Sequence, residues 1–353
     1  MSLTPTELVE DPLFQLNVLL WLAQPLPADN EIVPIFHRQG FTVYAIAPLL
    51  TVPLDMRLAI QQAQITVQGS FRPDAVLAHK PDRKFAFIEC KKSSFGPTSS
   101  TAQQALSILL AAGERPSEPL GLAPADVKES VVGYFLPGEQ AATLYQTLGQ
   151  LTETLSNHQM QAAHFTILAL QTGANELSVT IDDVGAEFFS LKSGSYPIMR
   201  LETDTDPRPL YFIPYDPDVT YSSEREKIFC KRVLFERLHS AVLVAVGRVN
   251  PPVELTLGPD SLLNDATFGM YAQWENQDSA RHMRGLCRQL MRSLAQSVNS
   301  VAQSVFRQNE RGTWDIKLDS VEQQEKAIDA LTRFACETLD LGAEAEPELF
   351  GDS

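Results

Sequence analysis

Two acids and a lysine, Asp74, Glu89 and Lys91, are the residues whose types and spacing point most directly to chemistry. If Asp74 and Glu89 lie side by side, their charges repel, and one takes up a proton unless a cation sits between them. Mg²⁺ prefers oxygen ligands, and proteins usually hold it with one or two carboxylates plus phosphate. A nearby ammonium group can stabilise developing charge on a phosphate or a water about to attack it. The three residues therefore indicate metal-assisted hydrolysis of a phosphodiester.

A β-hairpin would bring these residues together. Two short apolar runs, at 75–78 and 85–88, flank a turn centred on Pro81-Asp82, which is typical of a hairpin. This turn pairs position 80 with position 83, and the same count sets Asp74 opposite Glu89, with Cβ atoms about 4.5–5.5 Å apart. Side chains alternate along a strand, so Phe87, Glu89 and Lys91 share one face. The alternative is an ordinary hairpin that carries a surface Glu/Lys pair.

The same residues resemble a known nuclease signature. Pro73-Asp74, fourteen intervening residues and Glu89-Cys90-Lys91 are similar to the motif of the PD-(D/E)XK nuclease superfamily, over residues 65–112. The resemblance implies that Asp74 and Glu89 bind Mg²⁺, with Mn²⁺ able to substitute, and that Lys91 orients or activates the water. It also implies an α/β fold of restriction-endonuclease-like type, a mixed sheet core flanked by helices.

A helix is expected after the second strand, over residues 98–112, capped by Ser99 or Ser100. Gln104 falls in its first turns and is the preferred glutamine near the metal and the catalytic groups. Relatives with RecB-type nuclease domains carry a Gln followed four residues later by Tyr on this helix. Here Gln104 is followed by Ile108, so that tyrosine is absent. The alternative is that the glutamine belongs to a solvated helix face.

An apolar, buried helix is predicted over residues 12–24, because Asp11 precedes Pro12 as an N-cap. In some PD-(D/E)XK nucleases an acidic residue of the first helix joins the metal site, which makes Glu7 or Glu10 a candidate ligand. The alternative is that both acids complement the helix N-terminus. Further strands are expected at 41–47, 130–136, 164–171 and 177–181, and further helices at 54–64 and 139–157.

The distribution of predicted strands, helices and proline-rich segments divides the chain into two domains and a tail. Residues 1–190 are predicted to form the nuclease-like domain, and the segment 195–218, rich in Pro, Asp and Tyr, fits a linker or elaborate loop. Residues 195–342 are expected to form a mainly helical domain, with helices at 223–246, 278–306 and 321–339. That domain would recognise substrate, form a homodimer or bind a partner protein. Residues 343–353 form an acidic tail.

The net charge of −16 at pH 7 argues against indiscriminate binding to nucleic acid, but it does not exclude a local basic cleft. Candidate phosphate contacts lie around the hairpin and in an arginine row with four-residue spacing in the helix at 278–306. The alternative for the arginine row is a solvated face that is salt-bridged to acidic helices. The candidates are Lys80, Lys84, Lys92, Arg284 and Arg288.

The cysteines and the N-terminus predict a cytoplasmic protein. The four cysteines show no metal-ligand spacing, which favours reduced thiols and argues against an iron–sulfur nuclease. No basic region precedes the first apolar run, and that run, at 13–23, is too short to span a bilayer. We therefore expect a soluble protein with no membrane partner.

The function predicted from these residues is a metal-dependent nuclease, with DNA favoured over RNA. By analogy, such a core with an unusual second domain is typical of bacterial restriction or phage-defence proteins. Two alternatives remain open at this point. One is a non-catalytic assembly subunit that retains the fold, and the other is a phosphohydrolase that acts on small nucleotides.

Overall fold

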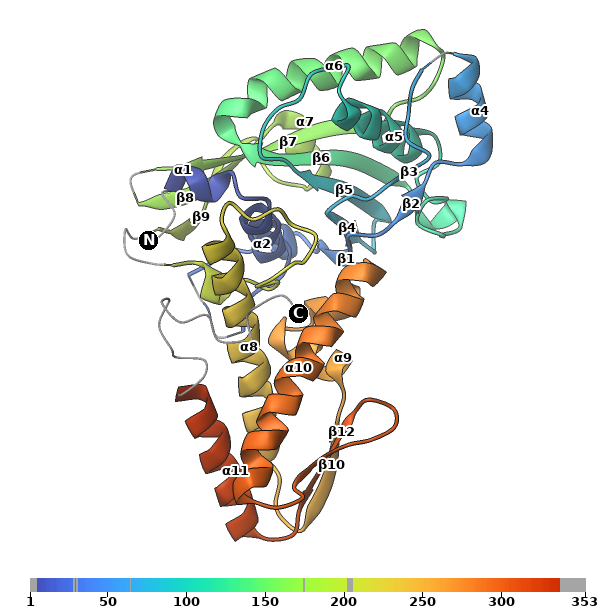
Figure 1. The fold of residues 1–353 in the computed structure, drawn as a ribbon. Helices are drawn as coiled ribbons and strands as arrows, with labels where there is room; N and C mark the ends of the chain where they lie inside the picture. Colours follow the sequence, from blue (N-terminus) through green and yellow to red (C-terminus); the bar gives the residue numbers. More distant parts are fainter. Residues whose placement is uncertain are drawn as a thin grey trace. The chain divides into compact units, whose positions relative to one another are not determined.

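The structure is a computed structural model that describes residues 5–27, 29, 31–63, 65–173, 175–201 and 206–336. These residues form two compact units. The first contains the described residues up to Asp206 together with Gln273–Asn276, and the second contains residues 207–272 and the described residues from 277 onwards. Each unit is shown in Figure 1.

A seven-stranded mixed sheet is the frame of the first unit (Figure 1). The strand order is β1-β4-β5-β6-β7-β8-β9, with β5, β6 and β7 parallel to one another and every other neighbouring pair antiparallel. A mixed α/β architecture is therefore confirmed. The strands are β1 (Thr42–Ile46), β4 (Ala75–His79), β5 (Lys84–Cys90), β6 (Glu129–Pro137), β7 (His164–Thr172), β8 (Glu176–Ile181) and β9 (Gly194–Arg200).

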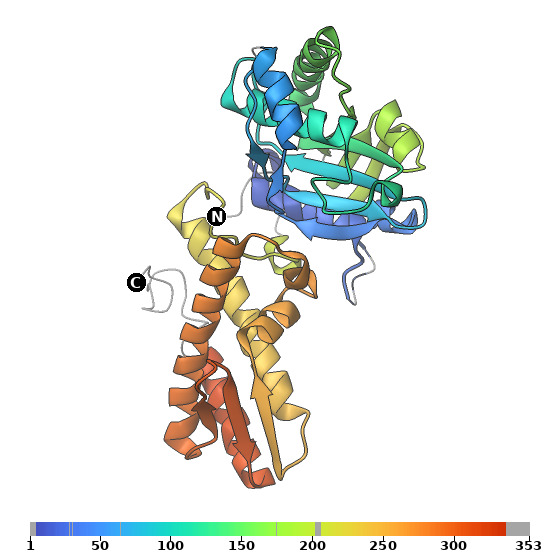
Figure 2. The same cartoon turned by 90° about the vertical axis from the view of Figure 1, so that its right-hand side faces the viewer.

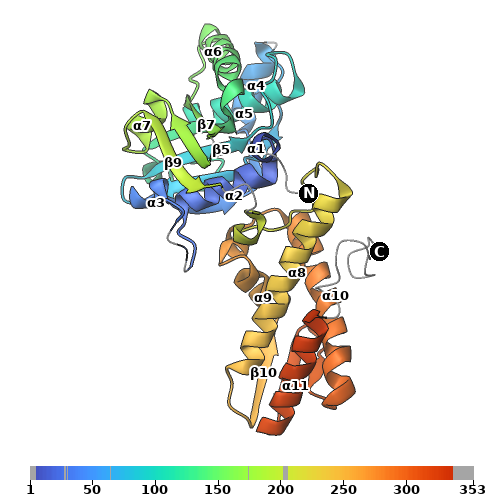
Figure 3. The ribbon, with the colours of Figure 1, turned by 90° about the vertical axis from the view of Figure 1, so that its left-hand side faces the viewer.

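Helices cover both faces of this sheet. Helices α5 (Ser100–Glu114) and α6 (Ala141–Asn157) lie on one side of it, and α2 (Pro12–Ala23) lies on the other (Figures 1 and 3). On the α5 side, Phe87 and Tyr134 belong to one buried cluster with apolar residues of both helices. The smaller elements are α1 (Pro5–Val9), α3 (Ile35–Arg38), α4 (Leu54–Gln62), α7 (Asp183–Phe188) and the short pair β2 (Leu50–Thr51) and β3 (Ser70–Phe71).

The two helices that flank the hairpin begin where the sequence predicts. Asp11 caps α2 by accepting a 2.8 Å hydrogen bond from the amide of Leu13, and Pro12 occupies the first helical position. Ser99 caps α5 by accepting a 3.1 Å hydrogen bond from the amide of Ala102. The other predicted strands and helices of this unit are also present, with ends shifted by a few residues. Residue 64, the predicted end of the helix at 54–64, lies outside the described residues.

Strand β9 lies in the segment that the sequence suggests is a linker. It pairs antiparallel with β8 at the edge of the sheet, so the first unit extends beyond residue 190. The strand contains Pro197, which lacks an N–H, and a sheet tolerates such a residue at its edge.

The second unit combines long helices with a small antiparallel sheet (Figure 2). The helix predicted at 278–306 ends early, because α10 stops at Val301 and Phe306 begins a strand. Residues 337–339 of the last predicted helix and the acidic tail 343–353 lie outside the described residues. The elements are α8 (Glu224–Gly247), β10 (Val253–Leu257), α9 (Pro259–Ala266), α10 (Gln277–Val301), β11 (Phe306–Gln308), β12 (Trp314–Leu318) and α11 (Val321–Phe334).

Among the described helices of both units, none has the length and apolar character that crossing a membrane would require.

Candidate active site

The β4–β5 hairpin has the register that the sequence predicts. Its pairs run from His79–Lys84 to Ala75–Ile88, so Asp74 and Glu89 stand one step further along the same ladder. This end of the hairpin adjoins the carboxyl ends of the parallel strands β5 and β6. Ligands in α/β sheets bind preferentially outside the carboxyl ends of strands, so the two acids lie at the favoured edge of the sheet.

Glu89 is at the centre of the site. Its side chain is 2% exposed, and its Oε2 lies 2.5 Å from Nζ of Lys91. Its Oε1 accepts a 3.1 Å hydrogen bond from Nε2 of Gln104, which α5 places over the end of the hairpin. One buried carboxylate thus receives a charged partner from its own strand and an amide from the following helix.

Asp74 is held at the same strand end by a backbone hydrogen bond. The amide of Cys90 donates to Oδ2 of Asp74 over 2.6 Å, and the Asp74 carbonyl accepts from the amide of Ala47. The structure therefore brings together all four residues that the sequence assigns to catalysis, Asp74, Glu89, Lys91 and Gln104.

The electrostatics of the site favour bound positive charge. Burial raises the pKa of Glu89 to about 7, although the Lys91 charge opposes this shift, and burial also raises the pKa of Asp74. Burial lowers the pKa of Lys91, but the charges of Glu89 and Asp74 outweigh that effect, so its net shift is upward. Two adjacent carboxylates, Glu89 buried and Asp74 partly buried, need protons or a cation, and Lys91 supplies one positive charge.

Gln15 of α2 is a site residue that the sequence reasoning missed. Its Nε2 donates to the carbonyls of Val9 (2.7 Å) and Lys91 (3.0 Å), while its buried Oε1 has no hydrogen-bond partner among the described residues. A glutamine in a mainly apolar, buried helix was the available signal, because buried amides require partners. Of the two candidate acids near this helix, Glu7 is exposed.

Tyr134 of β6 is the second residue that was missed. It pairs in register with Glu89 on β5 and is 1% exposed, yet its hydroxyl has no hydrogen-bond partner in the part of the chain that the structure describes. Burial, and after it the charge of Glu89, raises the pKa of Tyr134 well above the usual value, so the phenol is protonated at neutral pH. No sequence spacing reveals this neighbour, because the register of a parallel pair is set by the whole sheet.

The structure separates two of the candidate phosphate-binding lysines from the acids. Lys80 follows β4 and Lys84 begins β5, so both lie at the turn end of the hairpin, roughly 17 Å along the strand from Glu89. Lys84 also pairs with Glu129 at 3.2 Å and donates to the carbonyl of Phe188. Lys92 is exposed and directly follows Lys91 at the site.

The arginine row lies on α10 in the second unit. Nη1 of Arg284 is 3.3 Å from Oδ1 of Asp260 on α9 and 3.3 Å from the hydroxyl of Tyr271. Arg281 pairs with Asp278 at 2.9 Å. The Arg284–Asp260 pair agrees with the alternative of a salt-bridged face, and Arg288 is partly exposed on the same helix.

The site offers two carboxylates to a metal. Among the described residues, no group of three or more His, Cys, Asp or Glu side chains is arranged to hold an ion. Mg²⁺ that acts on phosphates keeps several waters and uses one or two protein carboxylates, so the adjacent Asp74 and Glu89 fit that use. The hydroxyl of Tyr134, which pairs in register with Glu89, adds unfilled hydrogen-bonding capacity on the neighbouring strand.

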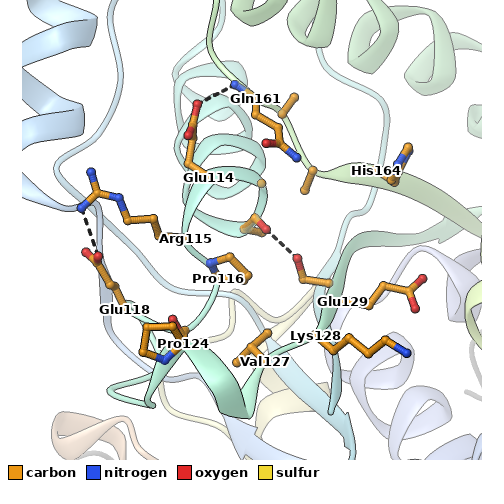
Figure 4. A pocket seen from close by; sticks show the side chains of 16 residues that line it. Glu114, Arg115, Pro116, Glu118, Pro124, Val127, Lys128, Glu129, Gln161 and His164 are labelled. Carbon is orange, nitrogen blue, oxygen red and sulfur yellow. Dashed lines mark hydrogen bonds and ion pairs between the residues drawn. The ribbon is translucent and has the colours of Figure 1, made fainter. Parts of the chain in front are cut away.

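A cavity of about 600 Å³ lies at the opposite ends of the parallel strands (Figure 4). It is bordered by the end of α5 and the starts of β6 and β7. Arg115 pairs there with Glu118 at 3.0 Å, and Glu114 accepts a 2.7 Å hydrogen bond from the amide of Gln161. The cavity is therefore separate from the acids, and Arg115 and Glu118 in its wall pair with each other.

The four converging residues thus form the chemically best-equipped place in the described structure. Comparison with known proteins gives no independent identification. No protein-family model, no curated protein and no solved structure matches the chain.

Proposed function

We propose that this protein is a metal-dependent nuclease that hydrolyses phosphodiester bonds of nucleic acid, with DNA as the favoured substrate. The observation that carries the proposal is the convergence of Asp74, Glu89, Lys91 and Gln104 at one strand end. A surface Glu/Lys pair on an ordinary hairpin would leave its glutamate solvated, whereas Glu89 is 1% exposed. Burying such a group costs free energy, which a functional role accounts for.

In this proposal each residue has a distinct task. Asp74 and Glu89 would hold Mg²⁺, which lowers the pKa of a bound water and neutralises charge on phosphate oxygens when it is present. The ammonium of Lys91, beside Glu89, would orient the attacking water or stabilise the charge that develops on the phosphate. The amide of Gln104 would hold the Glu89 carboxylate in position.

The order of elements supports a PD-(D/E)XK-type core. Along the chain, α2, the β4–β5 hairpin, α5 and β6 occur in the order helix, strands, helix and strand, with smaller elements and β1 between α2 and the hairpin. Helix, strands, helix and strand is the core order of the superfamily that the sequence resembles. A role in restriction or phage defence within the cytoplasm is proposed by analogy alone. The second unit would bind substrate, a second copy or a partner protein.

The test is incubation of the purified protein with circular and linear plasmid DNA, single-stranded DNA and RNA, in Mg²⁺ and in Mn²⁺. Wild type and Lys128→Ala are expected to cleave, because Lys128 is exposed and immediately precedes β6, at the strand end opposite the acids. Glu89→Gln and Lys91→Ala are expected to lose at least about 100-fold in rate. Equal cleavage by Lys91→Ala, or no cleavage of any substrate by wild type, would contradict the proposal.

One observation favours a second candidate, a non-catalytic assembly subunit. Both oxygens of Glu89 already have partners, Lys91 and Gln104, as a purely structural buried pair would. Equilibrium binding separates the two candidates without any substrate. A nuclease should show a saturable Mn²⁺ site that disappears in Asp74→Ala, whereas an assembly subunit should show none.

A further inference from the structure

Tyr134 buries a hydroxyl that the described structure does not use. The residue is 1% exposed, and its oxygen has no hydrogen-bond partner among the described residues. A phenylalanine would fill the same space without this cost, because an unpaired buried hydroxyl destabilises the folded state. Buried polar groups in folded proteins are nearly always hydrogen-bonded, so an orphaned one requires an explanation.

The position of Tyr134 points to Glu89 as the group that its hydroxyl would contact. The residue lies directly across from Glu89 on the parallel neighbouring strand, and adjacent strands are about 4.8 Å apart. Paired residues project from the same face of a sheet, so the phenol and the carboxylate point to the same side. On that side the ring belongs to the buried cluster under α5, with the ring centroid of Phe95 6.1 Å away.

The hydrogen bonds of Glu89 show when a further donor is needed. In the described state its two oxygens are occupied by Lys91 at 2.5 Å and Gln104 at 3.1 Å. If Lys91 turns to a water and one oxygen of Glu89 turns to a cation, the carboxylate loses its strongest partner. An ionised carboxylate accepts about four hydrogen bonds, and the protonated phenol, on the paired residue of the neighbouring strand, is a donor on the same face of the sheet.

We propose that Tyr134 is a positioning residue, whose hydroxyl donates to the Glu89 carboxylate when Glu89 turns towards a divalent cation and so fixes the orientation of that ligand. This inference rests on the proposed nuclease function, because it presumes that Asp74 and Glu89 bind a cation. Hydrogen-bond partners of metal ligands typically contribute 10–100-fold to metal affinity.

The experiment measures Mn²⁺ binding by calorimetry, and thermal unfolding without metal, on the full chain. Tyr134→Phe is expected to weaken Mn²⁺ binding roughly 10-fold or more, while its metal-free unfolding midpoint stays the same or rises. Saturating Mn²⁺ is expected to restore most of its cleavage rate. Tyr145→Phe is the matched control, because Tyr145 is 52% exposed and its hydroxyl lies outside the site.

The Glu89→Gln variant distinguishes failure of the Tyr134 proposal from failure of the nuclease proposal. If Glu89→Gln abolishes Mn²⁺ binding but Tyr134→Phe binds like wild type, the role of Tyr134 is refuted and the nuclease proposal stands. A lower metal-free midpoint in Tyr134→Phe would show that the hydroxyl has a structural partner, which also refutes the role. If wild type shows no saturable Mn²⁺ site, both proposals are refuted.

Discussion

The backbone amide of Cys90 donates a 2.6 Å hydrogen bond to Oδ2 of Asp74, so the strand that carries one acid of the site also fastens the other. The separation of Asp74 and Glu89 is therefore set by the main chain of the hairpin, and flexible side chains contribute little to it. Pre-organisation of this kind is what a metal site needs from its scaffold.

Two substitutions at Asp74 separate its bond to Cys90 from its charge. Asp74→Asn keeps an oxygen acceptor for the Cys90 amide, so we expect nearly wild-type stability but loss of saturable Mn²⁺ binding. Asp74→Ala leaves that amide unpaired and should lower the free energy of unfolding by about 1–2 kcal/mol as well. Urea unfolding and calorimetric Mn²⁺ titration measure the two effects, and equal stability of the two variants would contradict this account.

Glu89 should make stability depend on pH in an unusual direction. Its pKa is about 7 in the folded protein against 4.5 as the ordinary value, and burial is the main cause. Below about pH 4.5 the group is protonated in both states, and its contribution to stability is fully present. As the pH rises towards 7 only the unfolded chain loses the proton, so the free energy of unfolding falls, by on the order of 2–3 kcal/mol.

Urea unfolding at pH 5 and pH 8 tests this dependence. Glu89→Gln cannot titrate, so its loss of stability between the two values should be smaller than that of wild type. Glu153→Gln, at an exposed position of α6, is the control and should behave like wild type. Mn²⁺ should bind more tightly at pH 8 than at pH 6, because the ligand must be ionised. An identical pH dependence in wild type and Glu89→Gln would refute the assignment.

Gln15 should stabilise the segment that carries Lys91. Gln15→Met keeps the length of the side chain but removes the donor shared by the carbonyls of Val9 and Lys91. We expect a loss of about 1–3 kcal/mol in the free energy of unfolding, because two acceptors lose their donor. Gln103→Met, at a partly exposed position of α5, should change stability by less than about 0.5 kcal/mol. Equal midpoints for the two variants in urea would argue against the anchoring role.

The helix that carries Gln104 is packed against the chain at Gly113. A Cβ added there would lie 2.3 Å from the carbonyl oxygen of Gln161 and 2.4 Å from the amide nitrogen of Ala163. Because these are backbone atoms, Gly113→Ala should cost several kcal/mol, on the order of 3. Gly149 of α6 has no atom within 4 Å of such a Cβ, so Gly149→Ala should stabilise by about 0.5–1 kcal/mol. Thermal unfolding of both variants tests whether this contact fixes α5.

The part of the site that the sequence predicts is local in the chain. Asp74, Glu89 and Lys91 belong to one hairpin whose register follows from the turn at Pro81-Asp82, and Gln104 lies on the helix that comes next. Strand alternation and helix capping are short-range rules, so they are sufficient there. They are not sufficient for Gln15, whose bond to Lys91 spans 76 positions.

Among the elements that the sequence analysis missed, two strands have weak local patterns. Strand β9 contains Pro197 and has two consecutive buried residues, Ile198 and Met199, so it lacks a regular alternation, and β11 has only three residues. Strand β9 is stabilised by pairing with β8, and β11 by pairing with β12. A short window of sequence does not reveal such pairing. The helix predicted at 278–306 is too long for the same reason, since α10 ends at Val301 and Phe306 begins β11.

In the ion pair between Lys91 and Glu89, the chain itself supplies the positive charge that balances a buried carboxylate. Many small metal sites leave the protein unfolded until the ion arrives, because unpaired ligands repel one another. Here the ammonium of Lys91 lies 2.5 Å from Oε2 of Glu89, so one of the two acids has a positive partner without any ion from outside. Under the proposed nuclease function, formation of the hairpin would be uncoupled from metal supply, and Lys91 would have to release Glu89 before the reaction.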